Sequence, residues 1–359
     1  MSYFRDNIER MVGYEPGEQP ADPNVVKLNT NENPYPPSPA VLAALREVSP
    51  EQLRRYPDPT AGLFREAAAK LLDVSPEEII CGNGSDELLT MVTRAFAGPQ
   101  GVLAYPVPTY SLYRTLAHIE DAGFMEIPFG PDWSLPQQLF ETEASLTLLC
   151  NPNAPSGTMV PADEVSRLAG KVDGMLVIDE AYVDFADTNC LQLAHKHKNV
   201  LVLRTLSKGY SLAGLRFGFA VGNRQLIAGL DKVKDSYNCD TLSVLLASEA
   251  IQDQQTMREN NRKVCDQRDR LTQRLRAAGF EVPDSQANFL LARMPSGCGL
   301  TAKQFYQQLK DRGVYVRYLD HAAIADCVRI TVGTPQQNDI LLATMKQVLH
   351  FDIPKDASR

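Results

Sequence analysis

Short, continuous runs of apolar residues alternate with helix-length segments in the first two thirds of the chain. A helix is expected from Gly84 to about Phe96. Five apolar runs follow it: Val102–Ala104, Leu146–Cys150, Leu176–Ile178, Val200–Leu203 and Phe217–Val221. Continuous apolar strands that alternate with helices are typical of a mostly parallel sheet buried on both faces. The pattern therefore predicts a large α/β unit.

The segments on either side of this unit have a different pattern. The first 35 residues are rich in Pro, Gly, Asn and Glu and indicate an irregular arm. An apolar stripe predicts a helix between Ser38 and Val48, and Thr60 can cap a helix that runs to about Leu72.

A long helical pattern without proline, from about Leu242 to Ala278, leads to the C-terminal part. That part contains two expected strands and two expected helices: Asn288–Arg293, Val328–Val332, Thr301–Arg312 and Asn338–Leu349. We therefore expect three segments. They are an arm (residues 1–35) that joins the small domain, a large α/β domain (36–245) and a small α+β domain (246–359).

The composition and net charge of the chain limit the kinds of molecule that it is expected to bind. The 359 residues carry a formal net charge of −8 and no run of Lys or Arg. Nucleic acid and anionic membrane surfaces both require clustered cations, so neither is expected as a partner. The seven cysteines are scattered, never spaced Cys-x-x-Cys, and are expected to be reduced thiols of a cytoplasmic protein. Neither a signal-peptide pattern nor an apolar stretch of about 20 residues is present.

Polar residues directly follow three of the expected strands. Asn151–Gly157 follows the strand that ends at Cys150. Asp179-Glu180-Ala181-Tyr182 follows the strand that ends at Ile178, and Arg204–Gly209, with Lys208, follows the strand that ends at Leu203. Ligands of an open parallel sheet bind beyond the carboxyl ends of its strands. The sequence therefore brings an amide, a carboxylate and an amine to one edge of the sheet.

A phosphate site is expected at the same edge. Gly84, Ser85 and Asp86 open a helix whose free N–H groups and dipole suit an anion, and Arg216 could supply a cation. Taken singly, Lys208 would be a solvated lysine, Asp179 a helix cap and the glycine turn an ordinary strand–helix join. One ligand that needs all of them explains the set better. The histidines lack metal-ligand spacing, so no metal is expected.

These residues, taken in order, resemble a known family. The chain is similar to fold-type-I pyridoxal-phosphate aminotransferases, and among them to the histidinol-phosphate aminotransferases. The resemblance rests on Leu28–Tyr35, Arg55–Asp58, Gly82–Glu87, Pro108–Tyr110, Asp179–Tyr182, Ser207-Lys208, Gly214–Arg216 and Val328–Gly333. It implies an α/β fold with a large and a small domain, and pyridoxal 5′-phosphate as the cofactor.

The resemblance also implies roles for individual residues. Lys208 would hold the cofactor as a Schiff base and shuttle the proton, and Asp179 would keep the pyridine nitrogen protonated. Tyr182 would hydrogen-bond the phenolic oxygen of the cofactor, and Tyr110 would stack on its ring. The cofactor phosphate would be bound by the following groups: the backbone amides of Gly84, Ser85 and Asp86, the side chains of Ser207 and Arg216, and Tyr56 of a partner subunit. The enzyme would then be an obligate homodimer with shared active sites.

One position departs from the family pattern. Relatives commonly carry Asn-Asn-Pro-Thr-Gly where this chain has Asn153-Ala154-Pro155-Ser156-Gly157. The asparagine that usually donates to the phenolic oxygen aligns with Ala154. Asn153, a water molecule or Tyr182 alone are the alternatives for that contact.

The resemblance makes Arg329 the residue that anchors the substrate. Its guanidinium suits a carboxylate or a phosphate, so one site could accept both glutamate and a phosphate ester. Tyr14 and Asn29 are further substrate-binding candidates. Arg317 could add charge for a phosphate, although a solvated arginine at a strand end is an equal alternative.

Three activities are compatible with this apparatus. The leading hypothesis is transamination of L-histidinol phosphate with 2-oxoglutarate, which gives imidazole-acetol phosphate and L-glutamate in histidine biosynthesis. The alternatives are an aromatic amino-acid aminotransferase and a lyase, threonine-phosphate decarboxylase.

Overall fold

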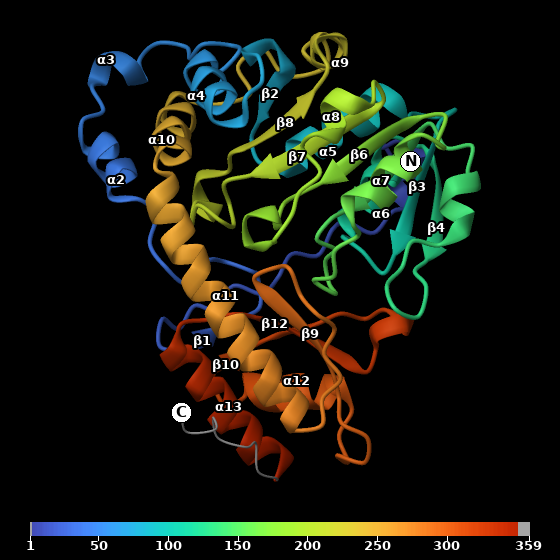
Figure 1. The fold of residues 1–359 in the computed structure, drawn as a ribbon, viewed down its shortest axis with the longest axis vertical. Coiled ribbons are helices and arrows are strands. Elements are labelled where there is room, and N and C mark those ends of the chain that lie inside the picture. Colours follow the sequence, from blue (N-terminus) through green and yellow to red (C-terminus); the bar gives the residue numbers. More distant parts are fainter. Residues whose placement is uncertain (1, 351–359) are drawn as a thin grey trace.

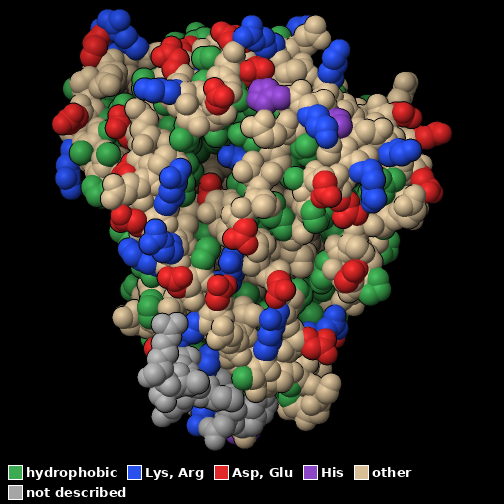
Figure 2. All heavy atoms as spheres, viewed as in Figure 1, with side chains coloured by type: hydrophobic (Ala, Val, Ile, Leu, Met, Phe, Trp, Pro, Cys, Tyr) green, Lys and Arg blue, Asp and Glu red, His purple; other side chains and the backbone are tan. Residues whose placement is uncertain are grey.

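A seven-stranded sheet forms the centre of the larger part of the molecule (Figure 1). The structure is a computed structural model and describes residues 2–350, whose side chains are coloured by type in Figure 2. The strand order is β2-β8-β7-β6-β5-β3-β4. Strands β3 to β7 run parallel, whereas β8 is antiparallel to both β7 and β2. The strands are β2 (Ile79–Gly82), β3 (Val102–Val107), β4 (Gly123–Pro128), β5 (Leu146–Cys150), β6 (Met175–Asp179), β7 (Val200–Thr205) and β8 (Gly218–Gly222).

Helices cover both faces of this sheet, which explains the continuous apolar runs. Every residue of β5 and of β6 is buried. One face packs against α4 (Gly62–Leu72), α7 (Ala162–Ala169), α8 (Leu193–Lys196) and α10 (Thr241–Gln252). The other face packs against α5 (Ser85–Phe96), α6 (Leu112–Ile119) and α9 (Arg224–Leu230). The expected α/β class with a mostly parallel sheet is confirmed.

The smaller part is built on a three-stranded antiparallel sheet of order β11-β12-β9. Its strands are β9 (Phe289–Arg293), β11 (Arg317–Tyr318) and β12 (Cys327–Thr331), and the helices beside it are α12 (Ala302–Lys310) and α13 (Pro335–Leu349). The N-terminal arm contacts this part: β1 (Val26–Lys27) pairs in parallel with β10 (Val314–Tyr315). The remaining helices are α1 (Asp6–Arg10), α2 (Pro39–Arg46) and α3 (Pro50–Leu53), with short 3₁₀ turns η1 (Pro76–Glu78), η2 (Gln137–Glu141), η3 (Val183–Phe185), η4 (Ala213–Leu215) and η5 (Ala322–Ile324).

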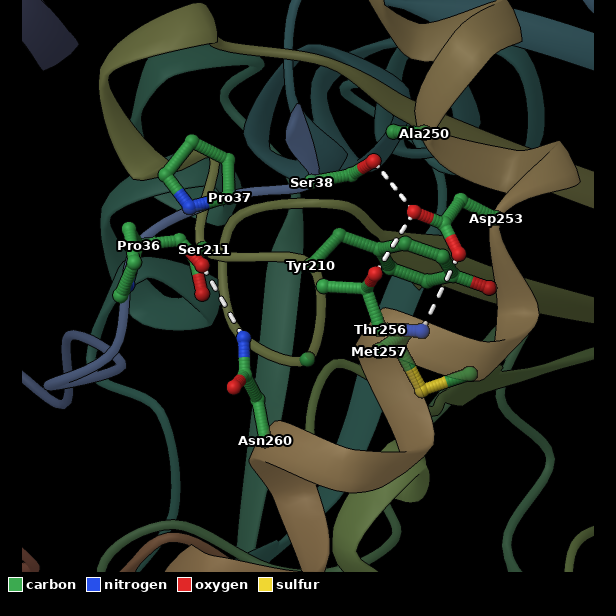
Figure 3. Close-up of a pocket in the computed structure, with 11 residues that line it drawn as sticks. Pro36, Pro37, Ser38, Tyr210, Ser211, Ala250, Asp253, Thr256, Met257 and Asn260 are labelled. Carbon is green, nitrogen blue, oxygen red and sulfur yellow. Dashed lines mark hydrogen bonds between the residues drawn. The ribbon is translucent and has the colours of Figure 1, made fainter. Parts of the chain in front are cut away.

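The single helix expected over Leu242–Ala278 is wrong, because two helices occupy this range. Helix α10 ends at Gln252 and α11 (Gln254–Ala277) begins after Asp253. The backbone of Asp253 leaves the helical region (φ −87°, ψ 69°), and its carboxylate caps α11 by accepting from Thr256 N at 3.1 Å. Ser38, the N-cap of α2, also donates to this carboxylate (Figure 3). The two helices are therefore separated by an aspartate that caps the second one, and no proline is needed to end the first.

Three smaller expectations also need correction. Thr60 does not cap α4, because that helix starts at Gly62 and the carboxylate of Asp58 accepts from Gly62 N at 2.7 Å. The short strand β2 was not expected. Edge strand β4 was not expected either, because four of its six residues are exposed and give no buried apolar run.

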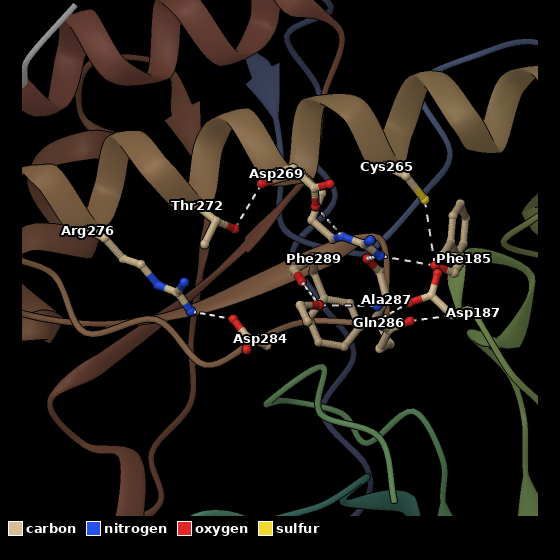
Figure 4. A network of polar contacts seen from close by, with 12 residues as sticks. Phe185, Asp187, Cys265, Asp269, Thr272, Arg276, Asp284, Gln286, Ala287 and Phe289 are labelled. Atoms are coloured by element: carbon tan, nitrogen blue, oxygen red, sulfur yellow. Dashed lines mark hydrogen bonds and ion pairs between the residues drawn. The ribbon is translucent and has the colours of Figure 1, made fainter. Parts of the chain in front are cut away.

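Helix α11 passes from the larger to the smaller part of the molecule (Figure 1). Figure 4 shows how its polar side chains hold segments of both parts. Arg268 Nη1 donates to the carbonyl oxygens of Phe185, at 3.0 Å, and of Ala287, at 3.4 Å. Phe185 follows β6 and Ala287 precedes β9, so Arg268 links a segment of the larger part to a segment of the smaller part.

Candidate active site

A cavity of about 490 Å³ lies beyond the carboxyl ends of β5, β6 and β7. Its walls come from loops that follow these strands, from the start of α5, from the N-terminal arm and from β11 and β12. The lining includes four basic side chains, Lys208, Arg216, Arg317 and Arg329, against two acidic ones, Asp86 and Asp179. This excess of positive charge suits an anionic ligand.

Asp179 ends β6 and is buried at the bottom of the cavity. Its Oδ2 accepts a hydrogen bond from Tyr113 OH at 3.0 Å, and its Oδ1 accepts from Ala181 N at 3.1 Å. Burial raises the pKa of the Asp179 carboxyl to about 6, against the lowering effect of these two hydrogen bonds. The group is therefore a carboxylate at neutral pH that gains strongly from a cationic partner.

Lys208 follows β7 and points into the same cavity. Its Nζ donates to the carbonyl oxygen of Thr30 in the arm at 3.2 Å and lies 5.9 Å from the ring centre of Tyr182. Burial, together with the charge of Arg329, lowers the pKa of the Lys208 ammonium to about 8. A neutral amine, which is the nucleophilic form, is thus accessible near physiological pH.

A cup for an anion lies at one end of the cavity, where α5 begins. Arg216 Nη1 donates to Ser207 Oγ at 3.3 Å, and its Nη2 donates to Asp86 Oδ2 at 3.2 Å. Gly84 has φ +82°, and a Cβ atom there would lie 2.6 Å from Arg216 Nη2. Only glycine therefore admits the guanidinium so close to the free N–H groups of the 12-residue helix.

Two tyrosines line the wall between the cup and Asp179. Tyr110 donates to Asp86 Oδ1 at 3.1 Å, and its ring meets the ring of Tyr14 edge-on with centroids 5.9 Å apart. The Tyr182 hydroxyl accepts from Asn31 Nδ2 at 3.0 Å, and its ring lies edge-on to Phe289. The two tyrosine rings can pack against a flat ligand, and the hydroxyl of Tyr182 can form a hydrogen bond with it.

The opposite end of the cavity is built by β12 and the arm. Arg329 Nη2 donates to the carbonyl oxygen of Asn29 at 3.0 Å, while the buried Arg329 Nε has no partner within residues 2–350. Burial lowers the pKa of this guanidinium, which nevertheless stays protonated. Arg317 lies opposite Arg329 in the β11–β12 register and donates to the carbonyl oxygens of Glu15 and Pro16. A partly buried cation whose Nε is buried without a partner is suited to an anionic substrate group.

The structure places two of the expected side chains away from the cavity. Asn153 does not line it: its amide donates to Pro108 O at 3.2 Å and to Ser156 Oγ at 2.9 Å, and accepts from Thr109 Oγ1 at 2.9 Å. Direct contact between Asn153 and a ligand would break this loop network. Tyr56 is 81% exposed and stacks on Tyr237, with ring centroids 4.6 Å apart, so it contributes nothing to the cavity of its own chain.

The sequence did not single out Tyr113 and Asn31, which hold Asp179 and Tyr182. Both lie within or beside segments that carry the family resemblance, but only the three-dimensional contact reveals their partners. Glu180, which was left out of the expected site, is buried on the other side of β6, where it accepts from Arg204 at 2.8 and 2.9 Å. Among the residues described, none form a group of His, Cys, Asp and Glu suited to a metal ion, and no helix is long and apolar enough to cross a membrane.

Comparison with known proteins decides the family. Residues 23–345 match the family model for aminotransferase class I and II. The chain belongs to this aminotransferase family. The aminotransferase is 49% identical over 350 residues to histidinol-phosphate aminotransferase 1 of Trichormus variabilis, with 97% of this chain and 99% of the relative covered.

Solved structures show the same fold. Histidinol-phosphate aminotransferase from Sinorhizobium meliloti, solved in complex with pyridoxal-5′-phosphate, superposes with a TM-score of 0.88 at 24% identity and covers 98% of each chain. L-threonine-O-3-phosphate decarboxylase from Porphyromonas gingivalis superposes with a TM-score of 0.78 at 22% identity, over 90% of the aminotransferase and 99% of that chain. The fold alone therefore does not separate transamination from decarboxylation.

The residues present in this aminotransferase fit pyridoxal 5′-phosphate, the cofactor of class I and II aminotransferases. The cup at Gly84 and Arg216 suits the phosphate, and Asp179 suits the ring nitrogen. Lys208 lines the same cavity as both, where its amine can react with an aldehyde.

Proposed function

We propose that this aminotransferase transfers the amino group of L-histidinol phosphate to 2-oxoglutarate, giving imidazole-acetol phosphate and L-glutamate in histidine biosynthesis. Pyridoxal 5′-phosphate serves as the cofactor. The full-length identity of 49% to a histidinol-phosphate aminotransferase supports the substrate. The observation that carries the proposal is the placement of Lys208 and Asp179 in one cavity with the buried, incompletely paired Arg329.

When bound, the cofactor supplies an electron-accepting ring on which an amine can be exchanged. Lys208 would hold the aldehyde carbon of the cofactor and would move the proton at the substrate carbon, because its lowered pKa lets the amine accept and return a proton. Asp179 would keep the ring nitrogen protonated. Tyr182 would donate to the phenolic oxygen, and Tyr110 would pack against the ring.

The cup at the start of α5 would bind the phosphate of the cofactor. Its ligands would be the backbone amides of Gly84, Ser85 and Asp86, the hydroxyl of Ser207 and the guanidinium of Arg216. Arg216 is half-exposed and forms an ion pair with Asp86, so the carboxylate of Asp86 partly neutralises the positive charge that Arg216 offers to the phosphate.

Arg329 anchors the substrate, with Tyr14 and Asn29 beside it. Its side chain contacts the ring of Phe289, 5.3 Å away, and its free Nε is buried. A buried donor without a partner costs free energy, which an anionic substrate group recovers on binding. One guanidinium can serve either the carboxylate of glutamate or the phosphate of histidinol phosphate.

Arg329→Ala is expected to weaken both substrates, by roughly 2–5 kcal/mol each, because a desolvated charge pair is lost. Steady-state kcat/KM for histidinol phosphate and for glutamate measures the effect. Arg329→Lys is the matched variant: it keeps the charge but loses the planar fork, so recovery should be partial. Loss confined to one of the two substrates would contradict a shared anchor and favour Arg317 as the phosphate ligand.

Two rival activities use the same apparatus, and one experiment separates them. Purified enzyme loaded with cofactor is mixed, in single turnover, with histidinol phosphate, glutamate, aromatic amino acids or threonine phosphate. The proposed function requires the fastest loss of the cofactor's visible absorption with histidinol phosphate and glutamate, without CO₂. Release of CO₂ from threonine phosphate would identify a decarboxylase, and preference for phenylalanine or tyrosine an aromatic aminotransferase.

The enzyme is proposed to act as a homodimer with shared sites. Large apolar side chains are exposed along a surface formed by α2, α3 and α4 and the loop at Tyr237: Leu42, Leu45, Leu53, Tyr56, Leu63, Leu71 and Tyr237. Exposed apolar patches mark interaction surfaces, and within this set the rings of Tyr56 and Tyr237 stack on each other. Covering this surface with a second copy would bring Tyr56 to the cofactor phosphate of the partner.

Mixing a weakened variant with an inactive one tests this shared site. Tyr56→Ala removes a hydrogen bond to the phosphate worth about 1.5–3 kcal/mol, and Lys208→Ala removes the covalent anchor. If Tyr56 acts in the partner's site, a mixed dimer has one intact site, and activity rises towards half the wild-type value per mixed dimer. Subunit exchange, verified with differently tagged chains, that restores no activity would refute the arrangement.

Two further expectations belong to this proposal. Residues 36–245 are proposed as the cofactor-binding domain, with 246–359 and the arm (1–35) as the small domain; residue 1 and residues 351–359 lie outside the described part of the chain. The enzyme is proposed to work in the cytoplasm. The seven free cysteines support a reducing compartment.

A further inference from the structure

The N-terminal arm, and not the loop after β5, supplies the amide that contacts Tyr182. Asn31 Nδ2 donates to Tyr182 OH at 3.0 Å, and both residues line the active-site cavity. The loop after β5 offers no equivalent group: Ala154 presents a methyl group, and the amide of Asn153 is bound to Pro108, Ser156 and Thr109.

Asn31 is held in a single orientation. It is 1% exposed, and its backbone adopts φ +57°, a region that asparagine tolerates better than most residues. Its N–H donates to Thr331 Oγ1 at 3.0 Å, Thr331 Oγ1 donates to Asn31 Oδ1 at 3.1 Å, and its carbonyl accepts from Asn288 Nδ2 at 3.0 Å. Because Oδ1 accepts from a hydroxyl, the NH₂ group is the one that faces Tyr182.

This orientation fixes the direction of hydrogen bonding at Tyr182. Burial raises the pKa of the Tyr182 phenol, so the group is neutral and carries one proton. Asn31 has no acceptor facing the phenol, and its N–H uses a lone pair of the phenol oxygen. The Tyr182 proton therefore remains available for an acceptor inside the cavity.

We propose that Asn31 is a positioning residue that makes Tyr182 a donor to the phenolic oxygen of the cofactor, in place of the amide that is absent at Ala154. The inference rests on the proposed function, since it presupposes bound pyridoxal 5′-phosphate. It also connects Tyr182 with the strand that carries the substrate anchor: Thr331 lies two residues after Arg329 on β12, so the two side chains share one face of the strand. The arm thus contacts the substrate anchor through Asn29 and the cofactor-orienting tyrosine through Asn31.

Asn31→Asp tests the direction of this hydrogen bond. The substitution keeps the size of the side chain, tolerates positive φ and preserves the acceptor for Thr331, but it replaces the donor to Tyr182 with an acceptor. The Tyr182 proton would then turn to the new carboxylate and leave the cofactor. We expect the pH midpoint of the visible absorption change of the bound cofactor to rise by about one to two units, because the anionic phenolic oxygen loses its donor.

The same substitution in a Tyr182→Phe background separates this mechanism from a general effect of charge or folding. If Asn31 acts through Tyr182, the midpoint of Tyr182→Phe is already raised, and adding Asn31→Asp moves it much less than in the wild type. A shift of equal size in both backgrounds would overturn the proposal.

Asn31→Gly provides a second test that adds no charge. Glycine tolerates the positive φ, so the variant loses the donor without backbone strain, and its midpoint should rise by a smaller amount that also vanishes in the Tyr182→Phe background. An unchanged midpoint in Asn31→Gly would likewise overturn the proposal. Wild-type enzyme that binds no absorbing cofactor would refute the proposed function itself, a result distinct from either failure above.

Discussion

Lys208→Ala is expected to abolish covalent retention of pyridoxal 5′-phosphate and to reduce turnover by at least roughly 10²–10⁴-fold, because one amine supplies both the anchor and the proton carrier. Intact-mass measurement after borohydride reduction should show a cofactor adduct in the wild type that maps to Lys208. The loaded variant should lose its cofactor on dialysis. Spectroscopy of the dialysed protein measures that loss.

Lys198→Ala is the matched control, since Lys198 is an exposed lysine just before the other end of β7. It should retain the adduct and the wild-type rate. A reduced adduct on any lysine other than Lys208 would reject the proposed anchor.

Asp179→Asn is expected to slow turnover by orders of magnitude while it stabilises the cofactor-free protein. The neutral amide no longer favours a protonated ring nitrogen, and each pKa unit lost there corresponds to about 1.4 kcal/mol. The stability gain follows from burial, which raises the pKa of Asp179 to about 6. A raised carboxyl pKa means that the folded state loses stability as pH rises from about 4 to above 6.

The gain from Asp179→Asn should therefore be on the order of 1–3 kcal/mol at pH 7 and should disappear near pH 3, where the carboxyl is largely protonated in both the folded and the unfolded state. Denaturant unfolding of the cofactor-free proteins at the two pH values measures it. Asp184→Asn is a close control, because burial also raises the pKa of Asp184 to about 6, yet this residue does not line the cavity. It should change stability alone. Normal turnover in Asp179→Asn would contradict the assignment.

The sequence was most informative where the chain is locally ordered. Asp179 and Lys208 could be located because buried strands are recognisable as apolar runs and their carboxyl ends share one edge of the sheet. Edge strand β4 could not, since its exposed residues carry no such run. The break at Asp253 was missed because an aspartate that caps a helix also fits within a helical pattern.

Contacts between distant segments were beyond sequence reasoning. Asn31 and Thr331 are hydrogen-bonded to each other although they lie 300 residues apart in the chain, and no local sequence pattern predicts that pairing. The amide of Asn153 could not be excluded either, because its hydrogen bonds depend on how the loop after β5 folds against Pro108. The roles of residues such as Asn31 and Asn153 can therefore be read only from the three-dimensional structure.

The two ends of the cavity differ in how much of the chain must be ordered to form them. The longest contact that shapes the phosphate cup joins Asp86 to Arg216, 130 residues apart, whereas Asn29 and Arg329 are 300 residues apart. Closing a longer loop costs more chain entropy, by about 0.6 kcal/mol for each doubling of its length. Partial unfolding that frees the arm from β12 therefore removes the grip on substrate first, and leaves a protein that still holds its cofactor.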